Sequence, residues 1–481
     1  MIALTTFLLT AVLVFLGNGL TPLWPVMWLA PMPVLWFALR RPAWQAGLVA
    51  GGAWLMGSLN LWNYFHLLGI PPLGWLASFG AEAVVFAGGV LLMRALVMRH
   101  AIGSAWLALP SLWAGFEFLA SLTPNGTAGD LAYSQLNFLQ FLQTASLTGP
   151  WGMSFVLMLL PTGLVLSYHL LSRERRLALK VLTATVGIVG ALLVFGTVRM
   201  ALPQSGPHVR VGLIASDANG GAAVEPPGSP TDTLLSDYAV YARQLITKGA
   251  QVIVMPEHVG VVRDNDVAYV DGLFQPIADQ THAVLVIGVA RISTAGKHNQ
   301  ARVYLPNSPV LTYNKEHLLP GFENTQLSAG TKRLYFDAPK GTAGPEAASK
   351  WGVEICKDMD FTEPSWRYGN AGVGLMLVPA WDFSVDGLWH GHLAVMRAVE
   401  NGFSLVRAAR EGLLTAADEY GRILAEKTSN AGHFATLIAD VPVEHQQTLF
   451  QILGDWFGWF SLGLLAFVLG RLWLGPRTKG V

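Results

Sequence analysis

The first part of the chain, from Met1 to about residue 200, alternates between long apolar segments and short turns. A helix that spans a membrane needs about 20 mostly apolar residues. Seven segments approach this length here and a shorter eighth follows much later: 3–18, 22–39, 43–65, 72–93, 101–122, 151–171, 181–198 and 456–470. The first has no Lys or Arg before it, which favours a retained helix over a cleaved signal peptide. The pattern predicts an α-helical membrane bundle of about eight spans, with seven in residues 1–200 and the last, with a tail, in residues 451–481.

Basic residues gather after every second predicted span. They are Arg40, Arg41, Arg94, Arg99, Arg173, Arg175, Arg176, Lys180, Arg471, Arg477 and Lys479. The loops after the first, third and fifth spans contain no Lys or Arg. Because loops rich in Lys and Arg stay in the cytoplasm, this distribution predicts that both termini are cytoplasmic. The segment between the seventh and eighth spans then lies on the opposite, periplasmic or extracellular side.

Residues 205–450 follow a different pattern, which is typical of a globular domain. Short apolar or β-branched runs predict strands, and apolar residues at helical spacing predict helices. The predicted strands are 208–216, 251–256, 283–290, 351–356 and 373–379, and the predicted helices are 233–248, 265–280 and 388–402. A loop rich in Gly and Pro is expected at 217–231. Strands that alternate with helices predict an α/β domain around a sheet.

Composition and charge support this division and exclude some functions. The chain is 52% hydrophobic and 13% charged, whereas soluble domains carry about 25% charged residues. Its net charge of zero gives no indication of nucleic-acid binding. Two acids, Glu82 and Glu117, fall within predicted spans, where an ionisable group has either a function or a partner inside the bundle.

Three residues that follow predicted strands, or lie close to one, have the chemistry of acyl transfer through a thioester. They are Glu257, Lys315 and Cys356. A thiolate is a strong nucleophile, a carboxylate takes and returns protons, and an ammonium stabilises the oxyanion of a tetrahedral intermediate. On spacing alone, the single cysteine of the chain is better interpreted as a small buried hydrophobic residue, as most lone cysteines are.

The residues around these three resemble the signatures of the carbon–nitrogen hydrolase, or nitrilase, superfamily. The matching segments are Met255-Pro256-Glu257, Tyr313-x-Lys315-x-His317-Leu318 and Ile355-Cys356. The resemblance implies an αββα sandwich and a catalytic triad of Glu257, Lys315 and Cys356. It also implies that a second glutamate, Glu323, and Asp358 support the triad, and that no cofactor or metal is needed.

The whole chain resembles the apolipoprotein N-acyltransferase family, in which a membrane bundle carries an external nitrilase-like domain. Tyr133-Ser134-Gln135 and Leu147–Gly152 resemble the external loop of that family. The resemblance implies an enzyme of the bacterial cytoplasmic membrane. Its acyl donor would be a membrane phospholipid, and its acceptor the amino terminus of a lipoprotein or another amine. Tyr133, Trp381 and His390 are candidates for substrate contacts.

Several segments near the expected pocket depart from the family pattern. Cys356-Lys357-Asp358 stands where the family carries Cys-Tyr-Glu, and Arg410-Glu411-Gly412 stands where it carries Asn-Asn-Gly. A more charged pocket favours an alternative function, a membrane-anchored amidase or nitrilase that uses water as the acceptor. A catalytically inactive scaffold is a third hypothesis, against which the intact triad argues. His390 and His392 form an isolated His-x-His pair, for which metal binding is a further alternative.

Overall fold

The computed structural model describes residues 1–202, 206–218, 222–223, 229–342 and 349–474. Most of the predicted loop 217–231, together with Arg477 and Lys479, lies outside the described residues. The chain divides into two compact units. A helical unit comprises Met1–Thr123, Gly129–Ala201 and the residues from Asp455 onward, and an α/β unit comprises Pro124–Ala128 and Leu202–Gly454.

The helical unit contains helices at all eight predicted positions. Its elements are α1 (Ile2–Gly17), α2 (Trp24–Met27), α3 (Met32–Ala38), α4 (Ala43–Gly57), η1 (Ser58–Leu61), α5 (Trp62–Leu67), α6 (Pro72–Met98), α7 (Ile102–Ser121), η2 (Leu131–Gln135), α8 (Leu139–Leu142), α9 (Ala145–Leu170), α10 (Arg175–Met200) and α16 (Trp456–Leu474). Among the described residues, α6, α9, α10 and α16 are long and apolar enough to cross a membrane. The count of eight spans stays a prediction.

Two of the predicted spans are interrupted. The segment 22–39 forms α2 and α3, and both helices carry proline in their first turn, where its missing N–H costs nothing. The segment 43–65 changes from α4 through the 3-10 helix η1 into α5. Hydropathy averaged over a whole span does not reveal such breaks.

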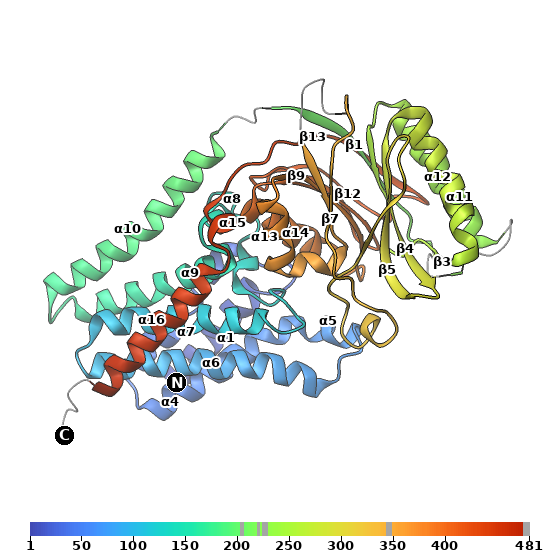
Figure 1. The fold of residues 1–481 in the computed structure, drawn as a ribbon. Helices are drawn as coiled ribbons and strands as arrows, with labels where there is room; N and C mark the ends of the chain where they lie inside the picture. The colour runs from blue at the N-terminus through green and yellow to red at the C-terminus, as the bar shows by residue number, and fades with distance from the viewer. Residues whose placement is uncertain (203–205, 219–221, 224–228, 343–348, 475–481) are drawn as a thin grey trace. The chain divides into compact units, whose positions relative to one another are not determined.

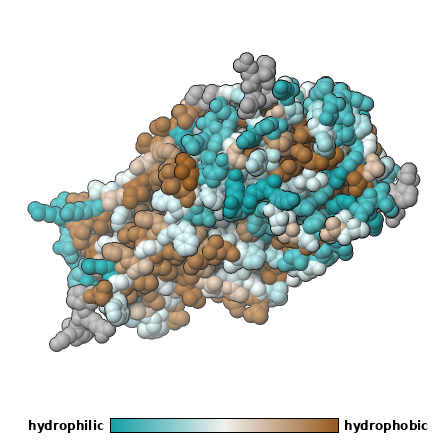
Figure 2. Space-filling view, in the orientation of Figure 1, coloured by the Kyte–Doolittle hydropathy of each residue, from teal (hydrophilic) through white to brown (hydrophobic). Residues whose placement is uncertain are grey.

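Apolar side chains face outward on the helical unit. Leu8, Val194, Trp459 and Trp473 are examples of large hydrophobic residues that are about half exposed or more, and Figure 2 shows apolar side chains gathered over the helices. Such a surface suits a lipid environment. The chain is therefore a membrane protein with several apolar helices.

The two acids within the predicted spans both have partners inside the bundle. Trp54 Nε1 donates to Glu82 Oε2 over 3.1 Å. Glu117 Oε1 accepts from Trp113 Nε1 and from the backbone N–H of Leu131, each over 2.7 Å. These contacts favour the structural interpretation of both residues.

The α/β unit contains two sheets (Figure 1). The order in the first is β13-β1-β2-β4-β5-β6, with β3 paired to β4, and in the second it is β12-β11-β10-β9-β8-β7. The first sheet comprises β1 (His208–Ala215), β2 (Val252–Val254), β3 (Val261–Arg263), β4 (Val284–Ser293), β5 (Gly296–Tyr304), β6 (Leu311–Asn314) and β13 (Ala435–Pro442). The second comprises β7 (Leu334–Asp337), β8 (Lys350–Val353), β9 (Val373–Trp381), β10 (Ser404–Arg410), β11 (Leu413–Ala417) and β12 (Ile423–Thr428).

Helices cover the outer face of each sheet, so that the unit has four layers. Side chains of both sheets, such as Val254 and Leu377, form one core between them. Ile253, the neighbour of Val254, belongs instead to the core under α11 (Pro230–Thr247) and α12 (Val267–Thr281). A third core joins the second sheet to α13 (Thr362–Asn370) and α14 (Gly387–Asn401). Alternate residues of a strand point to opposite faces, and the αββα sandwich follows.

Candidate active site

Glu257, Lys315 and Cys356 all follow the ends of strands in the α/β unit. Glu257 lies beyond β2, and its backbone N–H donates to the carbonyl of Ala380, in the other sheet, over 3.2 Å. Lys315 directly follows β6, and its N–H donates to Asn299 in β5 over 2.9 Å. Cys356 is the first residue of the 3-10 helix η5 (Cys356–Asp360). The two sheets therefore hold the residues of the predicted triad.

Glycine is required where Glu257 passes the first sheet. A Cβ atom on Gly288, in β4, would lie 2.6 Å from the Cα atom of Glu257, closer than real Cβ atoms approach. Any larger residue at position 288 would displace the main chain of Glu257, and with it the carboxylate, because the contact is with backbone atoms rather than with a flexible side chain.

Two carboxylates share the Lys315 ammonium. Lys315 Nζ lies 2.8 Å from Glu257 Oε1 and 2.8 Å from Glu323 Oε2. Asn299 Nδ2 donates to Glu257 Oε1 and, over 2.6 Å, to Glu323 Oε1. The backbone N–H of Leu319 also donates to Glu323 Oε2, over 2.8 Å. This network places Glu323 beside the triad and fixes the position of the ammonium.

The charges of this network stabilise one another. Burial alone would lower the pKa of Lys315, but the carboxylate of Glu257, with Cys356 and Glu323, raises it well above its ordinary value. Burial alone would raise the pKa of Glu323, but the ammonium of Lys315 outweighs it and the pKa falls below its ordinary value. Lys315 is thus a fixed positive charge, suited to stabilise an oxyanion rather than to exchange a proton.

Cys356 sits in a strained turn, not in a strand. The sequence predicted a strand from Trp351 to Cys356, but β8 ends at Val353. The strand prediction is wrong here because Asp358 Oδ2 takes the backbone N–H of Ile355 over 3.1 Å and closes a turn. Cys356 has φ +44°, a left-handed conformation that costs a non-glycine residue about 1–3 kcal/mol and is common at functional sites.

The thiol of Cys356 is held in its neutral form. It donates to the carbonyl of Trp381, at the end of β9, over 3.4 Å. Burial, followed by the neighbouring carboxylate of Glu257, raises the pKa of Cys356 well above its ordinary value. A base must therefore remove the thiol proton before or during attack.

Asp358 ties the Cys356 turn to the segment that carries Lys315. Its carboxylate is fully buried. Besides Ile355, it accepts from the Tyr313 hydroxyl and from the backbone N–H of His317, each over 2.8 Å. The order Tyr313, Lys315, His317 places Lys315 between the two donors, so that Asp358 positions the nucleophile relative to the ammonium.

The end of the turn is held by residues from far along the chain. The carbonyl of Asp360 accepts from the backbone N–H of Thr127 over 2.8 Å and from its hydroxyl over 2.7 Å. Gly126 precedes Thr127 with φ +64°, and a Cβ atom there would lie 2.5 Å from the Asp360 oxygen. The segment Pro124–Ala128 thus belongs to the α/β unit.

The other candidates have different surroundings. His390, in α14, lies 3.2 Å from Asp386 and 4.0 Å from Asp360. Burial alone would lower its pKa, but Asp386 raises it above the ordinary value. Tyr133 belongs to the helical unit, where it is 2% exposed in η2. Of the three candidates for substrate contacts, Trp381 is the one that meets the triad directly.

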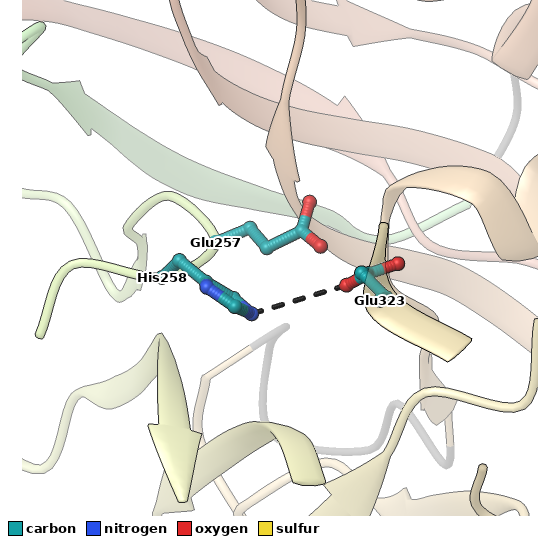
Figure 3. Close-up of side chains that lie close together, drawn as sticks. All are labelled: Glu257, His258 and Glu323. Carbon is teal, nitrogen blue, oxygen red and sulfur yellow. Dashed lines mark ion pairs between the residues drawn. The ribbon is translucent and has the colours of Figure 1, made fainter. Parts of the chain in front are cut away.

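His390 and His392 do not share a site. His392 Nε2 lies 2.9 Å from Glu426, and among the described residues neither histidine belongs to a group of three possible metal ligands. Such a group does form from Glu257, His258 and Glu323, with one ligand atom of each within 4.8 Å of the others (Figure 3). Because the Lys315 ammonium lies 2.8 Å from both carboxylates, a metal ion there would meet a like charge.

Sequence reasoning missed Asn299 and His258. Asn299 is fully buried in β5, and a polar residue in a strand carries no motif that reveals its partners. His258 has φ +53°, and burial lowers its pKa below the ordinary value, so that it is uncharged at neutral pH. Its position next to Glu257 was the only available signal.

Comparison with known proteins matches both parts of the chain. Residues 10–163 match the apolipoprotein N-acyltransferase N-terminal domain, and residues 228–449 match the carbon-nitrogen hydrolase family. An apolipoprotein N-acyltransferase of Geobacter metallireducens is 24% identical, with 95% of this chain and 92% of the relative covered. One of Gloeobacter violaceus is 26% identical, with the same coverage.

Solved structures are similar to about half of the chain. An amidase from Nesterenkonia sp. is 21% identical, with a TM-score of 0.41, and the similarity covers 51% of this chain and 94% of the amidase. Saccharomyces cerevisiae Nit3, a member of branch 10 of the nitrilase superfamily, is 19% identical with a TM-score of 0.41, covering 53% of this chain and 96% of Nit3.

Proposed function

Because the chain belongs to the apolipoprotein N-acyltransferase family, we propose that it moves an acyl chain from a membrane phospholipid to the amino terminus of a lipoprotein. The acyl chain is carried as a thioester on Cys356. The observation that carries the proposal is the set of buried Glu257, buried Lys315 and partly buried Cys356 in a chain that also has long apolar helices.

In the first half-reaction, Glu257 takes the proton of the Cys356 thiol and the sulfur attacks the ester carbonyl carbon of the phospholipid. The carbonyl oxygen becomes an oxyanion, which the ammonium of Lys315 stabilises. When the intermediate collapses, the carbon–oxygen bond of the ester breaks. Glu257 returns its proton to the departing alkoxide, so that a lysophospholipid leaves and the thioester remains.

In the second half-reaction, the free amine of the lipoprotein attacks the thioester carbonyl. Lys315 stabilises the second oxyanion, and Glu257 takes a proton from the attacking nitrogen. The carbon–sulfur bond then breaks, the sulfur recovers the proton from Glu257, and the amide is released. Glu323 and Asp358 act as positioning residues, since the first holds Lys315 and the second holds the Cys356 turn.

The helical unit gives this chemistry its physical advantage. Each CH₂ group moved from lipid into water costs about 0.8 kcal/mol, so that a nucleophile at the membrane surface avoids the extraction of a long acyl chain. We further propose eight spans in the bacterial cytoplasmic membrane, with the α/β unit outside and both termini in the cytoplasm, as the Lys and Arg residues after every second predicted span indicate.

The experiment supplies purified protein with a labelled phospholipid and a diacylated lipopeptide, and follows the mass of the protein, the amide product and free fatty acid. We expect an added acyl mass on Cys356 and an amide whose formation requires Cys356. Cys356→Ala is the control.

The alternative function is hydrolysis, in which water resolves the thioester. The charged residues Lys357, Arg410 and Glu411 favour it, because a charged pocket suits water and polar substrates. Free fatty acid without amide would indicate hydrolysis of the lipid. Release of ammonia from small amides, without either lipid product, would replace the transferase proposal with an amidase.

A further inference from the structure

Arg410 is a buried cation that uses little of its hydrogen-bonding capacity within the described part of the chain. It ends β10, in register with Trp381 at the end of β9, and its guanidinium carbon lies 4.4 Å from the centre of the Trp381 ring. Its side chain is 4% exposed. Among the residues that the structure describes, Arg410 Nε and Nη1 have no hydrogen-bond partner, and neither has Trp381 Nε1. Three unsatisfied donor atoms therefore lie on one stack of guanidinium and indole.

A second arginine of the same strand has a close carboxylate partner, although among the described residues its Nε has no hydrogen-bond partner either. Arg407 is 1% exposed and donates through both terminal nitrogens to the carboxylate of Asp382, over 2.9 and 2.5 Å. Arg410 Nη2 instead lies 3.7 Å from Glu411 Oε1, and the side chain of Glu411 is 33% exposed. A buried charge without a close partner is costly. The guanidinium of Arg410 is therefore suited to bind an anion.

The stack lies beside the nucleophile. The carbonyl of Trp381 accepts the thiol of Cys356, and the centroid of the His258 ring, next to Glu257, lies 6.1 Å from that of the Trp381 ring. An anionic group bound at Arg410 therefore belongs to a molecule that also reaches Cys356. In a phospholipid, only the ester oxygen and the glycerol carbons separate the ester carbonyl that Cys356 attacks from the phosphate.

We propose that Arg410 and Trp381 form an anion subsite that binds the phosphate of the acyl donor and so places its ester at Cys356. The inference rests on the proposed function. A planar guanidinium presents paired donors to phosphate oxygens, and the indole Nε1 adds a third donor nearby. The departure from the Asn-Asn-Gly pattern at Arg410 thereby acquires a role in the choice of donor.

The test compares two donors that differ in their headgroup, which is a phosphoglycerol in one and a free hydroxyl in the other. Purified full-length protein in detergent receives either dioctanoyl phosphatidylglycerol or dioctanoylglycerol, and the rate of acylation of Cys356 is followed by intact-protein mass spectrometry. The variants are Arg410→Asn, Arg410→Lys and, as a matched loss of an exposed charge in the same unit, Arg243→Asn. The ratio of the two rates is independent of the folded fraction, so that partial misfolding of a variant does not disturb it.

We expect the wild type and Arg243→Asn to be acylated faster by the phospholipid. Arg410→Asn should lose about ten- to hundredfold of the phospholipid rate, the usual effect of removing a charged hydrogen bond, while its rate with dioctanoylglycerol changes less than about twofold. Arg410→Lys should fall between them, because its ammonium keeps the charge but not the planar donors.

Other outcomes separate the subsite from the proposed function. If Arg410→Asn slows both donors equally, or neither, the anion subsite is overturned and Arg410 only packs on Trp381. If the wild type is acylated by neither donor, the acyltransferase proposal itself fails. If the wild type is acylated equally by both, phosphate recognition is refuted while thioester formation stands.

Discussion

Replacement of Lys315 by Met tests whether the buried charges form one network. Met keeps the length of the side chain but removes the ammonium that lies 2.8 Å from Glu257 and from Glu323. One oxygen of each carboxylate lies within 4.8 Å of the other. At an effective dielectric constant of about 20, two such charges repel by at least about 3.5 kcal/mol. Since loss of one partner from a buried ion pair costs about 3–5 kcal/mol, we expect a decrease of that size in the free energy of unfolding at pH 8.

The pH dependence of stability should change sign in this variant. In the wild type, the pKa of Glu323 lies below its ordinary value, so that its stabilisation is present above the unfolded pKa of about 4.3 and is lost as the pH falls through the folded value. Without Lys315, mutual repulsion raises the pKa of the carboxylate pair. A raised carboxyl pKa gives stability that is present at low pH and lost as the pH rises. As the pH rises from 5 to 8, the free energy of unfolding should therefore decrease in the variant but not in the wild type.

The assay is thermal unfolding of the detergent-solubilised protein between pH 5 and 8, together with acylation of Cys356. The double variant Lys315→Met/Glu323→Gln should recover most of the stability at pH 8, because one of the repelling charges is gone, but it should not recover acylation. Lys340→Met, an exposed lysine of the same unit, is the control. A double variant no more stable than Lys315→Met would refute the argument from repulsion.

Cys356→Ala and Cys356→Ser should each leave the fold intact, as judged by thermal unfolding, and should keep less than about a tenth of the wild-type turnover, since a hydroxyl is a much weaker nucleophile; greater activity would exclude a thioester. Asp358→Asn should cost about 1–3 kcal/mol, because one of its two accepting oxygens becomes an NH₂ group that faces a hydrogen-bond donor, and should slow acylation more than it lowers the unfolding temperature. A reporter that is active only in the cytoplasm should work when fused after Val481 and fail when inserted in 217–231, and the reverse would overturn the predicted topology.

Motifs and hydropathy located the elements that hold the candidate site but not the contacts within it. Glu257, Lys315 and Cys356 are recognisable because each stands in a short segment with a fixed neighbourhood. The shared position of Asn299 between two carboxylates could not be predicted, since it depends on side chains from three separate segments.

The predicted boundaries of helices and strands were wrong where a side chain or a proline interrupts the regular backbone hydrogen bonds. The sequence from Trp351 to Cys356 is apolar enough for a strand, yet Asp358 takes the Ile355 N–H and ends the strand early. In the helical unit, the segment 22–39 is apolar throughout, and its break between α2 and α3 coincides with prolines. In the first case a side chain competes for a backbone donor, and in the second proline lacks that donor; an average over many residues registers neither effect.

The short segment Pro124–Ala128 has a consequence for how this protein can be divided. It is encoded between two helices of the bundle, yet it packs with the α/β unit and occupies the Asp360 carbonyl at the end of the Cys356 turn. A recombinant fragment that begins at Leu202 would lack this segment. The Asp360 carbonyl would then lose both hydrogen bonds from Thr127. The domain that a continuous stretch of sequence would suggest is therefore smaller than the α/β unit. Truncation at Leu202 should make the Cys356 turn less rigid unless a peptide with the sequence of residues 124–128 is supplied in trans.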